Sequence, residues 1–431
     1  MDTTTTVPTV RFDPASQDFA SHAYERYAEL REESPVHRLL QPDGTEVWLI
    51  TRYDDVRAAL ADPRLSRDPR PVWRTLEERR LVSPVAAPGT STSPTYLGLN
   101  AAHLMVSDPP EHTRLRRLAG AAWTPRRIGR LRPRIEALTR RLLDEMAEKE
   151  SVDLLSAFAF PLPITAIYEL VGVPAADRPL IRRWAGLMES TNPELVQLWE
   201  QTFVQYASEL VRATMSHLRR DLPQEEQPDL LHALLAAGDE HDRLSHEEIA
   251  EMLVLLLNAG HETTAALIGN GMLALLRRPD QREVLRRHPE LLPNAVEELI
   301  RYDGPAERAT FRFSLEPLTF GGVTIPAHQM VGVVIASADH DPGQFEDPDR
   351  LDVARPRPEH VGFGHGIHFC VGAPLARLVG EIAFGALLAR FPEMELACRV
   401  EDLRFRAAGY QLRALRALPV HPHGKGRSPA R

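Results

Sequence analysis

The chain has 431 residues, of which 43% are hydrophobic and 26% are charged, a balance that excludes a largely disordered protein. Its formal net charge of −9 speaks against general nucleic-acid binding, and its two cysteines cannot build a disulfide framework. The longest apolar run, residues 252–257, is too short to span a membrane, and the first residues do not resemble a secretory signal. We therefore expect a cytoplasmic protein that binds neither nucleic acid nor membrane.

Helical periodicity dominates the chain, and strand-like runs are few. We expect helices at residues 27–33, 53–60, 128–148, 195–218 and 375–390, and strands at residues 46–51, 318–325 and 330–336. Because these strands come from distant parts of the chain, a small sheet should join its two halves. No repeat or linker divides the sequence, so we expect one domain over residues 1–431, ordered from about residue 12 to about residue 420, with flexible ends.

A stretch rich in helix breakers lies between Arg67 and Val106. Its centre, residues 83–94, consists almost entirely of proline, glycine, alanine, serine and threonine. A loop of this length inside a domain is either a linker or a functional segment.

One predicted helix is much longer than the others. Ser245 and Glu248 have the spacing of a capping box, and the helical pattern continues to Arg278, just before Pro279, over about 34 residues or roughly 50 Å. Its middle, residues 258–264, reads Asn-Ala-Gly-His-Glu-Thr-Thr and is poor helix-forming sequence. Two interpretations remain open: close helix packing with threonines bonded back to carbonyls, or a local opening beside a reactive group.

Cys370 lies just before a predicted helix that begins near Pro374. Backbone N–H groups and the positive end of the helix dipole should lower the pKa of a thiol at this position and favour a metal-binding thiolate. The glycines at 364, 366 and 372 allow the backbone to pass close to a flat or bulky group. The alternatives are a buried structural cysteine and a zinc site, but the histidines at 360, 365 and 368 lack the paired spacings of a zinc motif.

The segment 363–372 reads F-G-x-G-x-H-x-C-x-G, which resembles the haem-thiolate signature of the cytochrome P450 monooxygenases. Three further segments are similar to motifs of that family: Ala259-Gly260-x-Glu262-Thr263-Thr264, Glu298-x-x-Arg301, and Asp341-Pro342 followed by Pro348-Asp349-Arg350. The resemblance covers about residues 12–420 and looks closest to soluble actinobacterial members that tailor polyketides. It implies a triangular, mainly helical fold with small β-sheets and with haem between the long helix and the cysteine loop. Two positions depart from the pattern, His340 in place of arginine and Leu351 in place of phenylalanine.

The resemblance also implies which residues hold the cofactor, haem b. Cys370 would be the axial ligand of the iron, whose thiolate favours O–O cleavage, and Ala259, Phe363 and Gly372 would lie against the haem. Its propionates would be held by His112, Arg116, Arg312 and His368. Taken alone, the spacing of His112 and Arg116 suits a solvated helix face equally well.

For the two helix motifs the resemblance implies different roles. Thr263 would be the hydroxyl and Glu262 the acid that deliver protons during oxygen activation. Glu298, Arg301 and a third arginine, Arg350, would hold the haem-side scaffold together, which is a structural role.

Ten arginines lie between Arg114 and Arg141 against one acid, Glu136, so this segment carries a formal charge of +9 in an acidic chain. The resemblance places it near the haem. We therefore expect a docking face for an acidic ferredoxin, which would deliver electrons from NAD(P)H through a ferredoxin reductase, because the chain has no flavin or nicotinamide motif. The alternative is that these arginines solvate helix faces or pair with acids elsewhere.

The residues expected around a substrate follow one face of the long helix and the segments that the resemblance places near it. They are Met252, Leu255, Leu256 and Ala259, the 67–106 loop, Thr310, and the 410–412 tip with Gln411. An apolar wall with few polar groups favours a macrolide-, polyketide- or sterol-sized substrate that O2 hydroxylates or epoxidises. The alternative is that the aliphatic residues are core. A haem-binding module without turnover and a peroxide-driven oxidase also remain open, and we expect a monomer.

Overall fold

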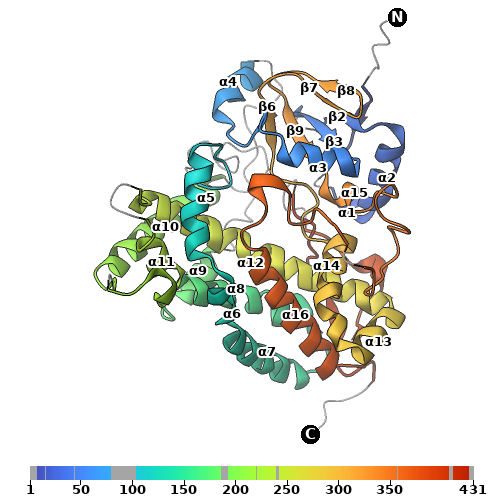
Figure 1. Cartoon of the computed structure of the whole chain (residues 1–431). Coiled ribbons are helices and arrows are strands. Elements are labelled where there is room, and N and C mark those ends of the chain that lie inside the picture. The colour runs from blue at the N-terminus through green and yellow to red at the C-terminus, as the bar shows by residue number, and fades with distance from the viewer. Residues whose placement is uncertain are drawn as a thin grey trace, which may run out of the picture.

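The computed structural model describes residues 7–14, 16–42, 44–78, 103–185, 193–219, 221–238, 242–356, 358–406 and 411–426. The protein is mainly helical, and Figure 1 shows most helices together, with most of the strands gathered at the opposite end. The helices are α1 (Gln17–Ser21), α2 (Ala23–Glu33), α3 (Tyr53–Ala61), α4 (Arg70–Glu78), α5 (Glu111–Ala122), α6 (Pro125–Gly129), α7 (Arg132–Ala147), α8 (Pro161–Val171), α9 (Arg178–Ala185), α10 (Pro193–Met215), α11 (Leu230–Leu235), α12 (His246–Arg277), α13 (Pro279–Arg287), α14 (Leu292–Asp303), α15 (Ile335–Ala338) and α16 (Ala373–Arg390). The strands are β1 (Thr9–Arg11), β2 (Val36–Leu40), β3 (Glu46–Ile50), β4 (Leu65–Ser66), β5 (Val152–Asp153), β6 (Arg312–Ser314), β7 (Leu318–Phe320), β8 (Val323–Ile325), β9 (Met330–Val333), β10 (Glu395–Leu396) and β11 (Pro419–His421).

A six-stranded sheet joins the two halves of the chain, as the sequence predicts. Its strand order is β1-β2-β3-β9-β6-β4, and β3 pairs in parallel with β9, so that Trp48 lies opposite Val331. The other two sheets are the three strands β10-β11-β5 and the hairpin β7-β8. Paired strands extend slightly beyond the expected ordered range at both ends, because β1 pairs with β2 and β11 includes His421.

The structure divides three of the predicted elements. Residues 128–148 contain the end of α6 and all of α7, because Pro133 in the first turn of α7 cannot continue α6. Residues 318–325 form a hairpin whose turn residues, Gly321 and Gly322, both have positive φ angles. Residues 330–336 begin as β9 and continue as α15, since a buried apolar run alone does not distinguish a strand from a helix.

The long helix α12 crosses the molecule (Figure 1) and is continuous over 32 residues. Its capping box forms as predicted: Ser245 Oγ accepts from the N–H of Glu248 at 3.1 Å, and the Glu248 carboxylate accepts from the N–H of Ser245 at 2.8 Å. Among the described helices only α12 is long and apolar enough to suit a membrane span. However, 61% of its most apolar window is buried inside the molecule, as in the core helix of a soluble protein.

The hydrophobic core consists of three clusters. The largest lies in the helical part, where α12 packs against α8, α10, α14 and α16. The two smaller clusters involve the six-stranded sheet, and alternate residues of β3 belong to different ones, Leu49 to one and Trp48 and Ile50 to the other. The loop that leads into α16 therefore lies between two separately packed parts of the molecule.

Candidate functional site

The loop that carries Cys370 runs between the sheet and the N-terminal end of α16 (Figure 1). Two hydrogen bonds fix it: Asp339 Oδ1 accepts from the N–H of Val361 at 2.8 Å, and the Phe363 carbonyl accepts from the N–H of Cys370 at 2.8 Å. Gly364 has a φ of +77°, which a residue with a side chain adopts only with strain. Within the described part of the chain, no three histidine, cysteine or acidic side chains are grouped to hold a metal, which speaks against the zinc alternative.

The electrostatic environment of the Cys370 thiol differs from the prediction. Burial raises the pKa of this thiol, although solvent reaches the side chain. The N–H groups of Gly372 and Ala373 and the guanidinium groups of Arg116 and Arg377 lower the pKa, but they do not offset burial. The helix N-terminus thus lowers the thiol pKa, as predicted. Desolvation by tertiary packing raises the same pKa by more.

Beside the cysteine loop lies a group of buried and half-buried cationic and imidazole side chains. We call it the cation cluster, and its members are Arg67, His103, His112, Arg116, Arg312 and His368. Burial lowers the pKa of Arg67 to about 9, of Arg312 to about 10 and of His103 to about 4. Repulsion adds to the effect, from Arg312 on Arg67 and from Arg67 on His103. These side chains are therefore poorly solvated and lie close to one another.

The hydrogen bonds of the cation cluster are incomplete among the described residues. Asp108 accepts from Ser66 and from the backbone N–H of Arg67, not from a guanidinium group. The buried Arg312 Nε and His368 Nε2 have no hydrogen-bond partner in the described structure. Buried cations with unused donors fit a ligand that carries carboxylates, and the two propionates of haem meet this requirement. The residues present therefore fit the cofactor that the sequence implies.

The structure brings together the four residues that the resemblance assigned to the propionates. The rings of His112 and His368 have centroids 4.2 Å apart. Arg67 and His103, the other two members, were not indicated by any motif. Arg67 directly follows β4, and the pairing of β4 with β6 places it beside Arg312 at the start of β6. A local sequence pattern cannot reveal such a contact.

Two residues one turn apart in the middle of α12, Ala259 and Thr263, are solvent-accessible although the helix crosses the molecule. The Thr263 hydroxyl donates to the Ala259 carbonyl at 2.8 Å, and the Thr264 hydroxyl donates to the Gly260 carbonyl at 3.0 Å. Gly260 faces α8, and a Cβ on it would lie 2.5 Å from Ile167 Cδ1. The close-packing interpretation is therefore confirmed for Gly260 and for the bonds from both threonines to carbonyls. The helix does not open in this segment, although Ala259 and Thr263 present accessible surface on another face.

Glu262 and Thr263 point in different directions, because neighbouring residues of a helix are about 100° apart. Glu262 Oε1 lies 3.6 Å from Arg406 Nη2, and the two side chains are 12% and 10% exposed. The Arg406 guanidinium also lies over the Phe160 ring, 5.8 Å from its centroid. Glu262, the expected proton-delivering acid, is thus paired with Arg406, which the sequence motifs did not indicate.

The expected apolar wall is only partly accessible. Met252 and Leu256 are 1% and 7% exposed and belong to the largest core cluster, so they match the core alternative. Leu255 is half-buried against that cluster, whereas Ala259 is exposed.

The polar side of the expected substrate region is built from two segments far apart in the chain. The Gln411 carbonyl accepts from the N–H of Glu307 at 2.9 Å, so the tip around Gln411 lies beside the segment that leads to the half-buried Thr310. Tyr410 and residues 79–102 of the long loop lie outside the described residues.

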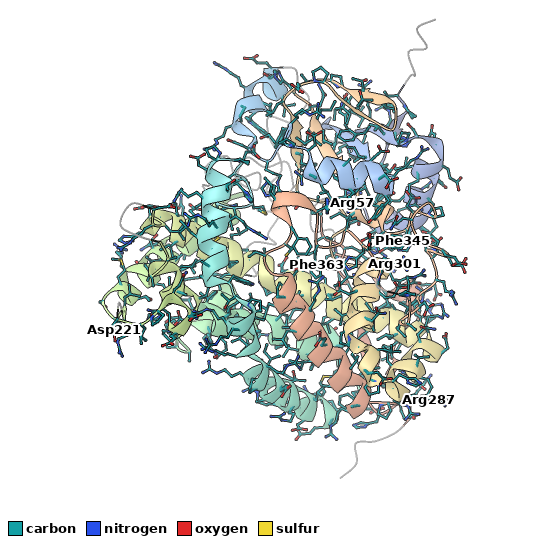
Figure 2. All side chains as sticks on the ribbon, in the orientation of Figure 1. Arg57, Asp221, Arg287, Arg301, Phe345 and Phe363 are labelled. Carbon is teal, nitrogen blue, oxygen red and sulfur yellow. The ribbon has the colours of Figure 1, made fainter. Side chains whose placement is uncertain are left out.

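A buried ion-pair network stabilises α14 against the segment before the cysteine loop. Glu298 and Arg301 form a fully buried pair at 2.7 Å, and Figure 2 shows Arg301 beside Phe345, whose ring centroid is 5.3 Å away. The third arginine is Arg355, which donates to Glu298 at 3.1 Å, and not Arg350. The Arg350 side chain is 56% exposed, and it is its backbone carbonyl that accepts from Arg301 and Arg355.

The two departures from the family pattern are accommodated locally. The ring of His340 lies 2.7 Å from Asp349 Oδ1 and 2.8 Å from the Tyr302 carbonyl, and it stacks on Tyr24 at 4.3 Å. Leu351 is fully buried. Neither departure disturbs the cysteine loop.

Much of the basic segment is paired, as the alternative interpretation says. Four of its arginines form ion pairs with acids elsewhere: Arg114 with Glu248, Arg117 with Asp242, Arg132 with Glu381, and Arg134 with Glu169. Arg127 is buried and donates to backbone carbonyls. Arg126 and Arg130, at either end of α6, are exposed.

Comparison with known proteins gives consistent results. Residues 164–400 match the profile of the family described as Cytochrome P450. The chain is 47% identical over 414 residues to Cytochrome P450 107B1 of Saccharopolyspora erythraea, covering 95% of this chain and 97% of the relative. It is 40% identical over 397 residues to Mycinamicin IV hydroxylase/epoxidase of Micromonospora griseorubida, covering 92% and 94%. A solved structure of the tirandamycin C-bound P450 monooxygenase TamI superposes with a TM-score of 0.81 at 42% identity, covering 96% of this chain and 99% of that one.

Proposed function

The chain belongs to the cytochrome P450 family and is a monooxygenase, and on this basis we propose that it hydroxylates or epoxidises an apolar natural product of macrolide or polyketide size. The relatives support this substrate class, because one is named a mycinamicin IV hydroxylase/epoxidase and one structural neighbour binds tirandamycin C. The observation that carries the proposal is the combination of Cys370 at a helix N-terminus with the cation cluster beside it.

When bound, haem supplies the activation of O2, with Cys370 as the ligand of its iron. The cation cluster would bind its propionates and fix its orientation. Thr263, on the accessible face of α12, would hold a proton at its hydroxyl, and Glu262 would resupply that proton from solvent. For this, the ion pair between Glu262 and Arg406 must loosen, because a paired carboxylate is a poor proton donor. Ala259 and Leu255 would form apolar surface that keeps water from the substrate.

We propose a ferredoxin, recycled by its reductase at the expense of NAD(P)H, as the electron donor. Exposed arginines at α6 and the apolar side chains of Ile367 and Phe369 in the cysteine loop, 50% and 38% exposed, suit an acidic partner with an apolar contact patch. Reduction by ferredoxin should slow as ionic strength rises, because exposed charges act over only about 8 Å at physiological salt. Arg126→Glu should mimic high salt, whereas Arg183→Glu on α9 should not. If the stopped-flow rate of reduction changes neither with salt concentration nor in the Arg126→Glu variant, this docking face is excluded.

The function is tested with the purified haem-loaded protein, ferredoxin, reductase, NADPH and a panel of macrolactones, sterols and small terpenes. A product with one added oxygen atom from a large substrate supports the proposal. Tight binding without turnover would indicate a haem-binding module, and turnover with H2O2 alone would indicate a peroxide-driven oxidase. Products from small terpenes alone would exclude the large-substrate assignment.

We further propose that the protein is cytoplasmic and monomeric. Gel filtration of the active enzyme tests its oligomeric state.

A further inference from the structure

An ion pair lies next to the cysteine loop and outside the cation cluster. Arg377 on α16 donates to both carboxylate oxygens of Glu297 on α14, with Nε 2.6 Å from Oε1 and Nη2 2.8 Å from Oε2. His360 Nε2 lies 3.1 Å from Oε2 of the same carboxylate. This two-point contact fixes the position of the Arg377 guanidinium.

The Arg377 guanidinium reaches Cys370 through Phe363. It lies 4.6 Å from the centroid of the Phe363 ring, which is labelled in Figure 2, and the Phe363 carbonyl accepts from the N–H of Cys370. Arg377 also lies close enough to Cys370 for its charge to act on the sulfur, as does Arg116. Arg116 belongs to the cation cluster, so Arg377 is the cation near the sulfur that lies apart from the propionate site.

Glu297 determines how much of the Arg377 charge acts on the sulfur. Burial alone would raise the pKa of Glu297, but hydrogen bonds from Arg377 and His360 outweigh burial and lower it to about 2. The carboxylate is therefore ionised at neutral pH, and it offsets the guanidinium charge at longer range. An uncompensated positive charge beside the thiolate would favour ferrous haem, which holds one more electron than ferric haem, and would weaken electron donation by the sulfur.

We propose that Glu297 and Arg377 are positioning residues that set the reduction potential of the haem by balancing the charge beside Cys370. This inference rests on the proposed function, because it takes Cys370 as the ligand of the iron. The step concerned is the reduction of ferric to ferrous haem by one electron from an external donor, in which no covalent bond forms or breaks.

Redox titration of the haem-loaded enzyme with dithionite, followed by its absorption spectrum, tests the proposal. E297Q leaves Arg377 uncompensated, so we expect a higher potential, with the equilibrium constant for reduction raised roughly tenfold. The Soret band of its ferrous–CO complex should move to shorter wavelength. R377Q leaves Glu297 uncompensated and should shift the potential in the opposite direction, whereas R377K keeps the charge and should stay close to the wild type.

The matched control is E283Q, which removes the carboxylate of an exposed ion pair on α13, 2.7 Å from Arg286. Potentials of E297Q and R377Q equal to that of E283Q would overturn the proposal. A shift in R377K as large as in R377Q would also overturn it, because stacking geometry and not charge would then be decisive. If E297Q does not retain haem, the reduction potentials of R377Q and R377K still test the proposal. A wild-type protein without a red-shifted ferrous–CO band would refute the proposed function instead.

Discussion

Cys370 is subject to opposing influences on its ionisation. Two backbone N–H groups and two guanidinium groups favour the thiolate, and burial disfavours it. Metal coordination would resolve this conflict, because a thiol that binds a metal cation is deprotonated outright. The environment of Cys370 therefore suits a metal ligand better than a free nucleophile.

Cys370→Ala should abolish the red-shifted Soret band of the ferrous–CO complex, because the variant lacks the proposed thiolate ligand. The second cysteine, Cys398, cannot replace it, since it follows α16 and packs against the helical core. The CO difference spectrum measures this directly. Cys398→Ala is the control and should keep the band, and a band retained in Cys370→Ala would show that the ligand is another residue.

Thr263→Ala should bind haem and substrate but divert electrons into peroxide, because the hydroxyl that we propose to hold the proton is lost. The measurement is the ratio of product formed to NADPH consumed, which we expect to fall at least several-fold. Thr264→Ala is the matched control, because the hydroxyl of Thr264 makes the same kind of bond to a carbonyl but is buried. Equal coupling ratios in the two variants would contradict the role of Thr263.

At the scale of elements, α12 combines tasks on different faces of one continuous helix. Gly260 permits close approach of α8, and Ala259 and Thr263 present accessible surface on another side. Glu262, on a third side, reaches Arg406. Small and polar residues in the middle of this helix weaken its intrinsic propensity, and tertiary packing against neighbouring helices, chiefly α8 and α10, compensates for that.

Gly260→Ala should destabilise the protein by roughly 1 kcal/mol, because the new Cβ meets Ile167 in a packed core. Denaturant unfolding of the haem-loaded protein measures the change. Ile167→Val shortens the opposing side chain, so the double variant should recover part of the loss. Gly120→Ala on α5, where a Cβ meets nothing within 4 Å, should be neutral or stabilising by about 0.5 kcal/mol. A Gly260→Ala variant as stable as Gly120→Ala would show that α8 does not limit this position.

At the scale of the whole molecule, the cation cluster lies where the sheet and the helical part meet. Arg67 and Arg312 come from the sheet, His112 and Arg116 from α5, and His368 from the cysteine loop. Burying like charges together is unfavourable without an anion. We therefore expect the cation cluster to lower the stability of the protein when no haem is bound.

Arg67→Met should have opposite effects on the free and the haem-loaded protein. Removing one poorly solvated cation should stabilise the free protein by on the order of 1 kcal/mol, since burial and Arg312 disfavour its charge. The same change should speed haem transfer to apomyoglobin, because a propionate loses a partner. Arg64→Met is the control, since Arg64 is 52% exposed and pairs with Asp62. If both variants lose haem at the same rate, Arg67 does not bind a propionate.

Much of the fold and part of the site follow from local patterns in the sequence. The capping box at Ser245, the position of Cys370 at the start of α16 and the i, i+4 relation of Ala259 and Thr263 all involve neighbours along the chain. Helical periodicity and turn chemistry are therefore sufficient to predict them. The same patterns could not divide residues 128–148 correctly, because the effect of Pro133 on the preceding turn competes with an uninterrupted helical pattern.

The sequence by itself determined the family, the mainly helical class, the long central helix and the candidate metal ligand, because these depend on motifs and periodicities within short segments. Only the tertiary structure decided that Arg355 and not Arg350 joins Glu298, and that Arg67 belongs to the cation cluster. It also decided that burial raises the pKa of Cys370. The physical reason is that desolvation and long-range ion pairs depend on which distant segments pack together, and neighbours in the sequence carry no information about those contacts.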